Sequence, residues 1–242
     1  MSLRVRAFFF HVLISLVIAA IVVALVFGVW YPAPLHQALG VTTIFLLLLL
    51  VDVTLGPLLT FLVFKPGKKS LALDLTVIAC LQLSALGYGM WTVAEGRPLW
   101  LVFNVDRFDL VQAVDVDDRR LSEALPEYRR EGWLGPEWVG AVRPVEHSLS
   151  QQILFESLVG GSDIAQRPEL YRQLGYFALE LRAKGLPLEQ LKEYNDPAEV
   201  AETLAHWPQA GSWLPLMARV RPMVVLLGTG SEVLGVVPLT PW

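Results

Sequence analysis

Few side chains in this sequence have the type and spacing that enzyme chemistry requires. The four histidines, His11, His36, His147 and His206, have no second ligand three or four residues further along the chain, which argues against a metal site. The segments VGGSD and GTGS fit no phosphate-binding pattern, and no GxSxG motif is present. We therefore predict a protein that is not an enzyme, with no catalytic residue, no metal site and no cofactor.

Two charged segments remain as candidates for binding. The run DVDDRR, at Asp115 to Arg120, has three carboxylates but lacks the glycine and the distal glutamate of a calcium loop. We expect it to be the solvated first turn of a helix. Asp106 and Arg107 lie between two predicted strands, where they form a turn or an ion pair, or contact a partner.

The most unusual ionisable residue is Asp52, in the apolar run LLLLLVDVTLGPLLTFLVF. A charged side chain near the centre of a bilayer costs at least ~2.5 to 3.5 kcal/mol on insertion scales. At 1.5 Å per residue, Asp52 lies roughly 18 Å before the end of its helix at Phe64. Gln82 is expected at a similar depth on the next helix. The two residues therefore predict a polar notch within the membrane.

Neighbouring residues of the same run favour a site for helix packing. Pro57 has no N–H and leaves a main-chain carbonyl of the preceding turn without its helical partner. Gly56 lets another helix approach closely, and Thr54 adds a hydroxyl. Two interpretations stay open. Asp52 hydrogen-bonds Gln82 and holds the bundle together, or the notch receives a polar group of a partner helix.

The composition indicates that these residues belong to a membrane protein. Of the 242 residues, 54% are hydrophobic and only 17% are charged, against roughly 25% in an average soluble domain. Three apolar runs are long enough to span a bilayer, at about 8–30, 41–64 and 71–93. The first exceeds the apolar core of a signal peptide and has no cleavage site after it, so we expect an uncleaved span.

The distribution of lysine and arginine predicts the orientation of the spans. Arg4 and Arg6 precede the first run, a KPGKK turn joins the second and third, and the YPAPLHQA loop has neither residue. The positive-inside rule then places the N-terminus and the KPGKK turn in the cytoplasm. Trp30 with Tyr31, and Tyr88 with Trp91, are expected at the outer interface. We predict a bacterial inner-membrane protein whose residues 94–242 are periplasmic.

The predicted periplasmic part is long enough for one domain. Strands are expected at Leu99–Val105 and Phe108–Val114, in WVGAVRPV, and in a closing hairpin around GTGS. Helices are expected at Leu149–Val159, Pro168–Lys184 and after an Asp196 N-cap. The fold class is therefore three N-terminal transmembrane α-helices (1–93) followed by a periplasmic α+β domain (94–242) whose terminal strands share a sheet. Its fourteen Lys/Arg against twenty-one Asp/Glu argue against nucleic acid as a partner.

Two segments, VDVTLGPLLTFLVFKPGKK and LVFNVDRF, closely resemble the TfpX/TfpZ family of type IV pilin accessory proteins. The resemblance implies an inner-membrane accessory or chaperone protein that stabilises the major pilin or promotes its assembly. Its partners would be the major type IV pilin, the lipid bilayer and other pilus assembly components. The residues of this chain that match the motifs are Asp52, Gly56, Pro57, Lys65, Pro66, Gly67, Lys68, Lys69, Asp74, Asp106 and Arg107.

We assign these residues two roles. Asp52, Gly56, Pro57, Gln82, Asp106 and Arg107 are candidates for partner binding, and the remaining motif residues, from Lys65 to Asp74, form the cytoplasmic turn. Two other functions stay open: a non-catalytic subunit of a pilin-glycosylation system, and a membrane sensor with a periplasmic ligand-binding domain. The short cytoplasmic segments leave little chain for the output of a sensor.

Overall fold

The computed structural model describes residues 2–129 and 132–242, and the chain divides into two compact units. One unit holds the segment up to Val29 together with Gly40–Glu95. The other holds Trp30–Leu39 together with Gly96–Trp242. The short segment 30–39 therefore packs with the C-terminal domain, although it connects the first two long helices in sequence.

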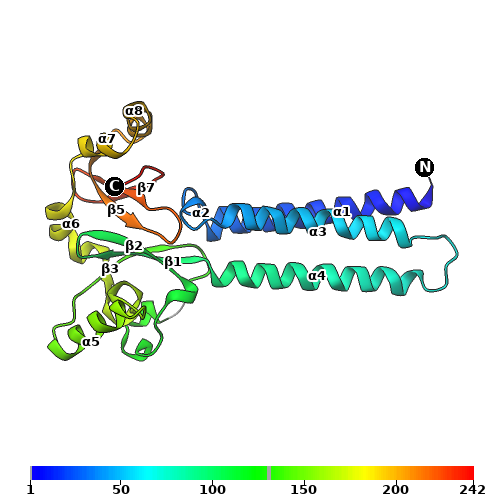
Figure 1. Ribbon diagram of the computed structural model, residues 1–242, viewed down its shortest axis with the longest axis horizontal. Helices are drawn as coiled ribbons and strands as arrows, with labels where there is room; N and C mark the ends of the chain where they lie inside the picture. Colours follow the sequence, from blue (N-terminus) through cyan, green and yellow to red (C-terminus); the bar gives the residue numbers. More distant parts are fainter. Residues whose placement is uncertain (1, 130–131) are drawn as a thin grey trace. The chain divides into compact units, whose positions relative to one another are not determined.

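Three long helices form the first unit: α1 (Leu3–Leu25), continued by a π-helical turn at Val26–Trp30, then α3 (Val41–Val63) and α4 (Leu71–Glu95). All three are long and apolar enough to cross a membrane, as predicted. In Figure 1, α3 runs beside α1, and it packs against both α1 and α4. The middle helix of the sequence is thus also the one that both of the others contact.

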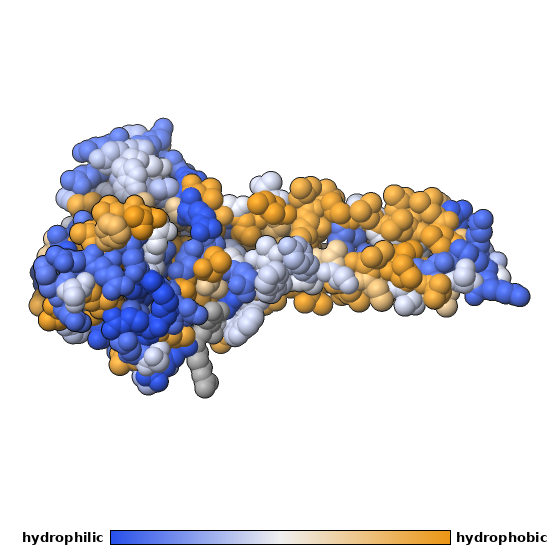
Figure 2. Space-filling view, turned by 60° about the horizontal axis from the view of Figure 1, so that its bottom comes forward, coloured by the Kyte–Doolittle hydropathy of each residue, from blue (hydrophilic) through white to orange (hydrophobic). Residues whose placement is uncertain are grey.

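The surface of these helices is apolar over most of their length. Leu13, Leu47 and Leu81 are each more than half exposed, as expected of side chains that face lipid. Figure 2 shows these helices covered by hydrophobic residues, with hydrophilic residues at the end that carries the N-terminus. This surface is what a membrane-embedded bundle requires.

The second unit is built on one mixed sheet of seven strands, in the order β4-β3-β1-β2-β5-β6-β7. β1 pairs with β3 and β2 pairs with β5 in parallel, and the other neighbours are antiparallel. The strands are β1 (Pro98–Asn104), β2 (Arg107–Gln112), β3 (Glu137–Ala141), β4 (Tyr171–Gln173), β5 (Ala210–Met217), β6 (Met223–Gly228) and β7 (Val233–Val237). The expectation that the first strands and the C-terminal hairpin share a sheet is confirmed.

The helical middle is only partly as predicted. Helices α5 (His147–Leu158) and α8 (Pro197–Ala205) are confirmed, and Asp196 caps α8 through the N–H of Ala198 at 2.7 Å. The single helix expected at Pro168–Lys184 is wrong: β4 and 3-10 turns precede a short α6 (Ala178–Lys184). Pairing with β3 overrides the helical pattern there. A further short helix, α7 (Leu191–Tyr194), precedes α8.

Apolar side chains fill both faces of the sheet. On β6, Val225 and Leu227 face one cluster, which α6 covers through Leu181. Val224 and Leu226 face the opposite cluster, which α7 and α8 cover. On the same face as this second cluster, the part of the sheet formed by β1 and β3 is covered by α5. Because β1 is buried along its whole length, its residues 98–103 form a continuous apolar run without alternation, and only its last residue, Asn104, is polar.

The segment 30–39 contributes to this core. Its short helix α2 (Leu35–Ala38) buries Leu35 and Ala38 in the same cluster as Phe103 and Leu214. The carbonyl of Ala38 accepts the N–H groups of Val220 and Arg221, both at 3.1 Å. Trp30 and Tyr31 are buried in this unit, and the ring of Trp30 lies 6.2 Å from that of Trp133. Their expected position at the outer membrane interface stays a prediction.

Candidate functional site

A groove of about 660 Å³ lies between α3 and α4 and contains most of the predicted partner-binding residues of the membrane region. Its walls are almost entirely leucine, isoleucine, valine and alanine. Asp52 from α3 and Gln82 from α4 are its two polar residues, and Gly56 also lines it. Pro57 follows on α3 and is buried. The notch predicted from the sequence is therefore part of a larger apolar groove.

Gln82 connects the two helices across this groove. Its Nε2 donates a hydrogen bond to the main-chain carbonyl of Asp52 at 3.1 Å. The acceptor is thus the backbone, and this bond does not require a carboxylate at position 52. Thr54 does not reach another helix, because its hydroxyl donates to the carbonyl of Leu50 at 2.8 Å within α3.

Gly56 on α3 lies directly against the side chain of Gln82 on α4. A Cβ at this position would lie 1.9 Å from Nε2 of Gln82. The absence of a side chain therefore makes room for the amide that bridges the helices. Small residues at such contacts are the usual way in which spanning helices pack closely.

Polar contacts also join α1 to α3. Nδ1 of His11 lies 2.7 Å from Oγ1 of Thr60, which is buried. The guanidinium of Arg4 donates to the carbonyls of Phe61 and Leu62 and stacks on the ring of Phe61 at 4.2 Å. A cation at the carboxyl end of a helix complements the partial negative charge there. Arg4 thus lies at the same end of the bundle as the turn that follows α3.

The KPGKK turn is exposed throughout, from Lys65 and Pro66 to Lys69. Gly67 has φ +79°, in the left-handed region that favours glycine. Lys68 forms a salt bridge with Asp74 at 2.6 Å. Asp74 therefore fixes the turn to the first turn of α4, where a carboxylate also complements the helix dipole.

In the domain, Asp106 and Arg107 lie at the tip of the β1–β2 hairpin. The two-residue turn is Val105–Asp106, so the expected turn is present. The ion pair of Arg107 is with Asp109, at 3.0 Å, and Asn104 donates to the other oxygen of Asp109 at 2.9 Å. Burial raises the pKa of the Asp109 carboxyl, and Arg107 opposes that shift. Asp106 is exposed and makes no salt bridge among the described residues.

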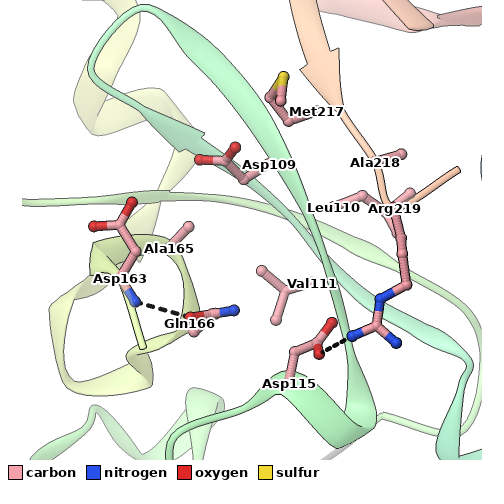
Figure 3. A pocket seen from close by; sticks show the side chains of 10 residues that line it. All are labelled: Asp109, Leu110, Val111, Asp115, Asp163, Ala165, Gln166, Met217, Ala218 and Arg219. Atoms are coloured by element: carbon pink, nitrogen blue, oxygen red, sulfur yellow. Dashed lines mark hydrogen bonds and ion pairs between the residues drawn. The ribbon is translucent and has the colours of Figure 1, made fainter. Parts of the chain in front are cut away.

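A small cavity of about 290 Å³ lies beside Asp109 (Figure 3). Asp163 and Asp115 also line it, and Arg219 donates to Asp115 at 2.9 Å. In the view of Figure 3, Asp109 and Asp163 lie on one side of Val111, with Arg219 and Asp115 on the other. Within residues 2–129 and 132–242, no group of three or more His, Cys, Asp or Glu side chains has the arrangement of a metal site.

The acidic run at Asp115 to Arg120 does not begin an α-helix, contrary to the prediction, and only a 3-10 turn at Leu121–Glu123 follows it. Asp117 instead accepts hydrogen bonds from Arg119 and Ser162, and these contacts lower the pKa of the Asp117 carboxyl well below its usual range. Arg119 and the buried Arg167 both donate to Glu156 on α5, each at 2.6 Å. Residues 115–120 are thus held to α5 by ion pairs that span distant parts of the sequence.

The spanning helices and the α+β domain mark the chain as a membrane protein, and comparison with known proteins gives its family. The family model of the fimbrial assembly protein FimB matches residues 1–40. The serogroup I fimbrial assembly protein of Dichelobacter nodosus is 36% identical over 182 residues, which are 74% of this chain and 70% of that protein. The chain belongs to the fimbrial assembly protein family.

Two further relatives from the same organism agree with this assignment. The serogroup E1 fimbrial assembly protein is 35% identical over 182 residues, again 74% of this chain and 70% of the relative. The protein of serogroups C1 and C2 is 38% identical over 119 residues, or 48% of this chain and 88% of the relative. No solved structure matches the chain. The predicted role in fimbrial assembly is confirmed, and the TfpX/TfpZ name stays a prediction.

Sequence reasoning missed three features of these sites. It predicted the polar notch but not the larger apolar groove between α3 and α4. It also did not predict the pairing of Arg107 with Asp109 or the ion cluster around Arg167. The spacing of Arg107 and Asp109 on one face of a strand was a usable signal, because side chains two apart in a strand lie on the same face. Nothing in the local sequence indicates that Arg167 meets Glu156.

Proposed function

We propose that this chain is an inner-membrane accessory protein of type IV pilus assembly, of the TfpX/TfpZ kind, which stabilises the major pilin or promotes its assembly. The N-terminus and the KPGKK turn are cytoplasmic, and residues 94–242 are periplasmic. The protein has no catalytic activity in this role. Membership of the fimbrial assembly protein family supports the process, and the groove between α3 and α4 supports the mode of action.

The groove between α3 and α4 is the main support for pilin binding, because its apolar lining suits the side chains of a membrane helix. Its walls are aliphatic, its volume of about 660 Å³ is large, and its two polar residues lie together near the middle of the spans. In lipid, helices associate through close packing and through hydrogen bonds between polar side chains. We assign the groove to the membrane helix of the pilin subunit, with the Asp52 side chain as the group that recognises a polar atom of that helix.

The orientation rests on the charges of the first unit. Of its five Lys and Arg residues, Arg4 and Arg6 lie in the first turn of α1 and the three lysines of the KPGKK turn follow α3, and Arg4 contacts the last turn of α3. The cations are therefore gathered at one end of the bundle, as the positive-inside rule requires of a cytoplasmic end. A reporter enzyme fused after Trp242 is expected to be active only in the periplasm, and one in the KPGKK turn only in the cytoplasm. The opposite pattern would refute the orientation.

The test of pilin binding fills the groove. Ala85 is exposed and lines the groove, so Ala85→Trp blocks it without replacing a packed side chain. Ala79 is also exposed on α4 but does not line the groove, and Ala79→Trp is the matched control. We expect pilin to co-purify from solubilised membranes with the unmodified chain and with Ala79→Trp, and to be lost with Ala85→Trp at equal abundance. Equal recovery with both variants would exclude the groove.

Substitution of Asp52 then separates the two interpretations of the notch. The hydrogen bond from Gln82 to the Asp52 carbonyl survives any change of the Asp52 side chain. We therefore expect Asp52→Asn and Asp52→Leu to keep normal abundance and to reduce pilin recovery and piliation, because the carboxylate is lost. Normal recovery in both variants would mean that the carboxylate does not contact the pilin.

A further inference from the structure

A second groove, of about 680 Å³, lies in the domain beyond the end of β3. Three cations from three different segments line it: Arg143 in the loop after β3, Arg172 on β4 and Lys184 on α6. Glu180 is the one acidic residue in its lining. We refer to these residues and their neighbours as the cationic groove.

These three cations lack acidic partners. Among the described residues, none of them lies within 4 Å of a carboxylate, whereas other cations of the domain do, among them Arg107, Arg119, Arg120, Arg167, Lys192 and Arg219. The guanidinium of Arg172 is held by main-chain carbonyls, including that of Tyr171 at 2.6 Å. Residues 94–242 contain fourteen Lys/Arg against twenty-one Asp/Glu, so acidic residues for pairing are abundant. The positive charge of this groove is therefore left for a ligand.

The groove also offers apolar contacts. Phe177 and Val142 form part of its lining, and Tyr176, which is 71% exposed, and Val145 lie at its surface. Val105 lines it as well, with φ +65°. A β-branched residue rarely adopts this backbone conformation, and such strain collects at binding sites. A ligand of this groove therefore has both negative charge and apolar groups.

The position of the groove favours an extended ligand. β4 is the last strand on its side of the sheet, so one of its edges is unpaired within the sheet. Arg172 is the residue of this strand that lines the groove, so a peptide that lies extended along the groove reaches the end strand of the sheet. Peptides often bind at sheet edges in this way, with side chains supplying the specificity.

We propose that the cationic groove binds an extended acidic segment of a partner protein, with its carboxylates on Arg143, Arg172 and Lys184 and its apolar side chains on Tyr176 and Val145. This surface is separate from the groove between α3 and α4, and the proposal holds whichever protein occupies that groove. It gives the domain its own contact with an assembly partner.

The test uses the full chain in a non-ionic detergent and a dye-labelled peptide in which glutamate alternates with valine. Fluorescence anisotropy measures binding. We expect the double variant Arg143→Ser/Lys184→Ser to weaken binding about fivefold to tenfold, since each exposed ion pair contributes modestly. Glu180→Gln should tighten binding by removing a competing carboxylate. The control Arg182→Ser/Lys192→Ser makes the same charge change at exposed residues outside the lining, and should bind as the unmodified chain does.

Several outcomes would overturn the proposal. Equal weakening by the two double variants would show that only net charge matters. Equal binding of a peptide with lysine in place of glutamate would exclude charge recognition. Displacement of the peptide by inorganic phosphate or phosphatidylglycerol vesicles at the same concentration of charge would show a general anion or lipid site. Binding of the glutamate peptide alone, lost only in the groove variant, supports the proposal.

Discussion

In the spanning helices the large apolar side chains face outward, whereas in the domain they face inward. Leu13, Leu47 and Leu81 are more than half exposed, while Leu214 and Leu226 on the sheet are completely buried. Both regions are rich in leucine and valine, so composition alone does not separate the two arrangements. The difference shows that the solvent of each region decides which surface of an apolar element is packed.

Polar side chains differ between the two regions in the opposite way. Within the bundle, the bond from Gln82 to the Asp52 carbonyl and the bond between His11 and Thr60 each join two helices. In the domain the buried Arg167 holds Glu156 together with Asp117 and Glu169. In lipid, apolar burial gives little preference for one helix contact over another, so small and polar residues specify the packing. In water, apolar burial drives folding, and buried charges must be paired.

The largest expected effect comes from breaking the buried ion cluster of the domain. Arg167→Met leaves the carboxylates of Asp117, Glu156 and Glu169 without their central cation, and should lower the free energy of unfolding by about 3 to 5 kcal/mol. Denaturant unfolding of the purified chain, followed by tryptophan fluorescence, measures this loss. Arg219→Met is the control, because the Arg219 side chain is mostly exposed and its pair with Asp115 contributes ~0 to 1 kcal/mol. Equal losses of stability in Arg167→Met and Arg219→Met would contradict the claim that the buried ion cluster stabilises the domain more than the exposed pair.

The next largest loss of stability is expected from a substitution in the segment 30–39, which packs in the domain core. Leu35 lies in the segment between α1 and α3, but its side chain packs in the domain core, where its exposed fraction is only 3%. Leu35→Ala should destabilise the domain by about 2 to 5 kcal/mol through the cavity that it leaves. Gln37→Ala, at an exposed neighbour, should have little effect.

The same contact predicts the behaviour of a domain fragment. A fragment of residues 94–242 alone lacks Leu35 and Ala38, and should unfold at lower denaturant than a fragment with residues 30–39 joined to it by a flexible linker. Identical stability of the two fragments would contradict a structural role for the segment. Circular dichroism with urea as denaturant is sufficient for this comparison.

A smaller effect is expected at the centre of the bundle. Gln82→Leu removes the hydrogen bond to Asp52, and interhelical bonds of this kind contribute on average ~0.6 kcal/mol and at most ~1.7 kcal/mol. Unfolding in mixed micelles with increasing dodecyl sulfate measures the change. Ser84→Leu makes a similar polar-to-leucine change on α4 outside the groove. A loss from Gln82→Leu larger than that from Leu35→Ala would reverse the ranking of the two regions.

The smallest expected effect is a change in pH dependence at the edge of the ion cluster. The hydrogen bond from Arg119, together with those from Gln152 and Arg167, lowers the pKa of Glu156 to about 2 from an ordinary value of 4.5. Because the pKa is depressed in the folded state, its stabilising contribution is present above pH 4.5 and is lost as the pH falls toward 2. Glu169 acts in the opposite direction, since burial raises its pKa.

Glu156→Gln should therefore flatten the loss of stability between these two pH values. The thermal unfolding midpoint as a function of pH is the measurement. Glu199→Gln, at an exposed position on α8, should leave the profile of the unmodified chain unchanged. A profile that is the same in all three proteins would mean that the Glu156 carboxylate is not paired in solution.

Elements with a local pattern could be predicted from the residues alone. A run of some twenty apolar residues must form a helix in lipid, because its main-chain polar groups have no other partners there, and this fixed the three spans. The Asp196 cap with Pro197, and the GTGS turn between two apolar strands, likewise needed only neighbouring residues. Asp52 and Gln82 were matched from their depths along straight helices. These predictions succeeded because rise per residue and turn chemistry do not depend on the fold.

Features that join residues far apart in sequence depend on the packing of the folded chain. Tyr171–Gln173 is a strand because β3 lies beside it, although its own segment has helical spacing. Leu35 and Ala38 belong to the domain core because the sheet offers them an apolar surface, which the short loop sequence does not reveal. Arg107 pairs with Asp109, and Arg167 with Glu156, because burial leaves each charge only the partner that the fold brings within reach. Apolar burial and charge pairing depend on which surfaces meet, and that is set by the packing of the whole chain.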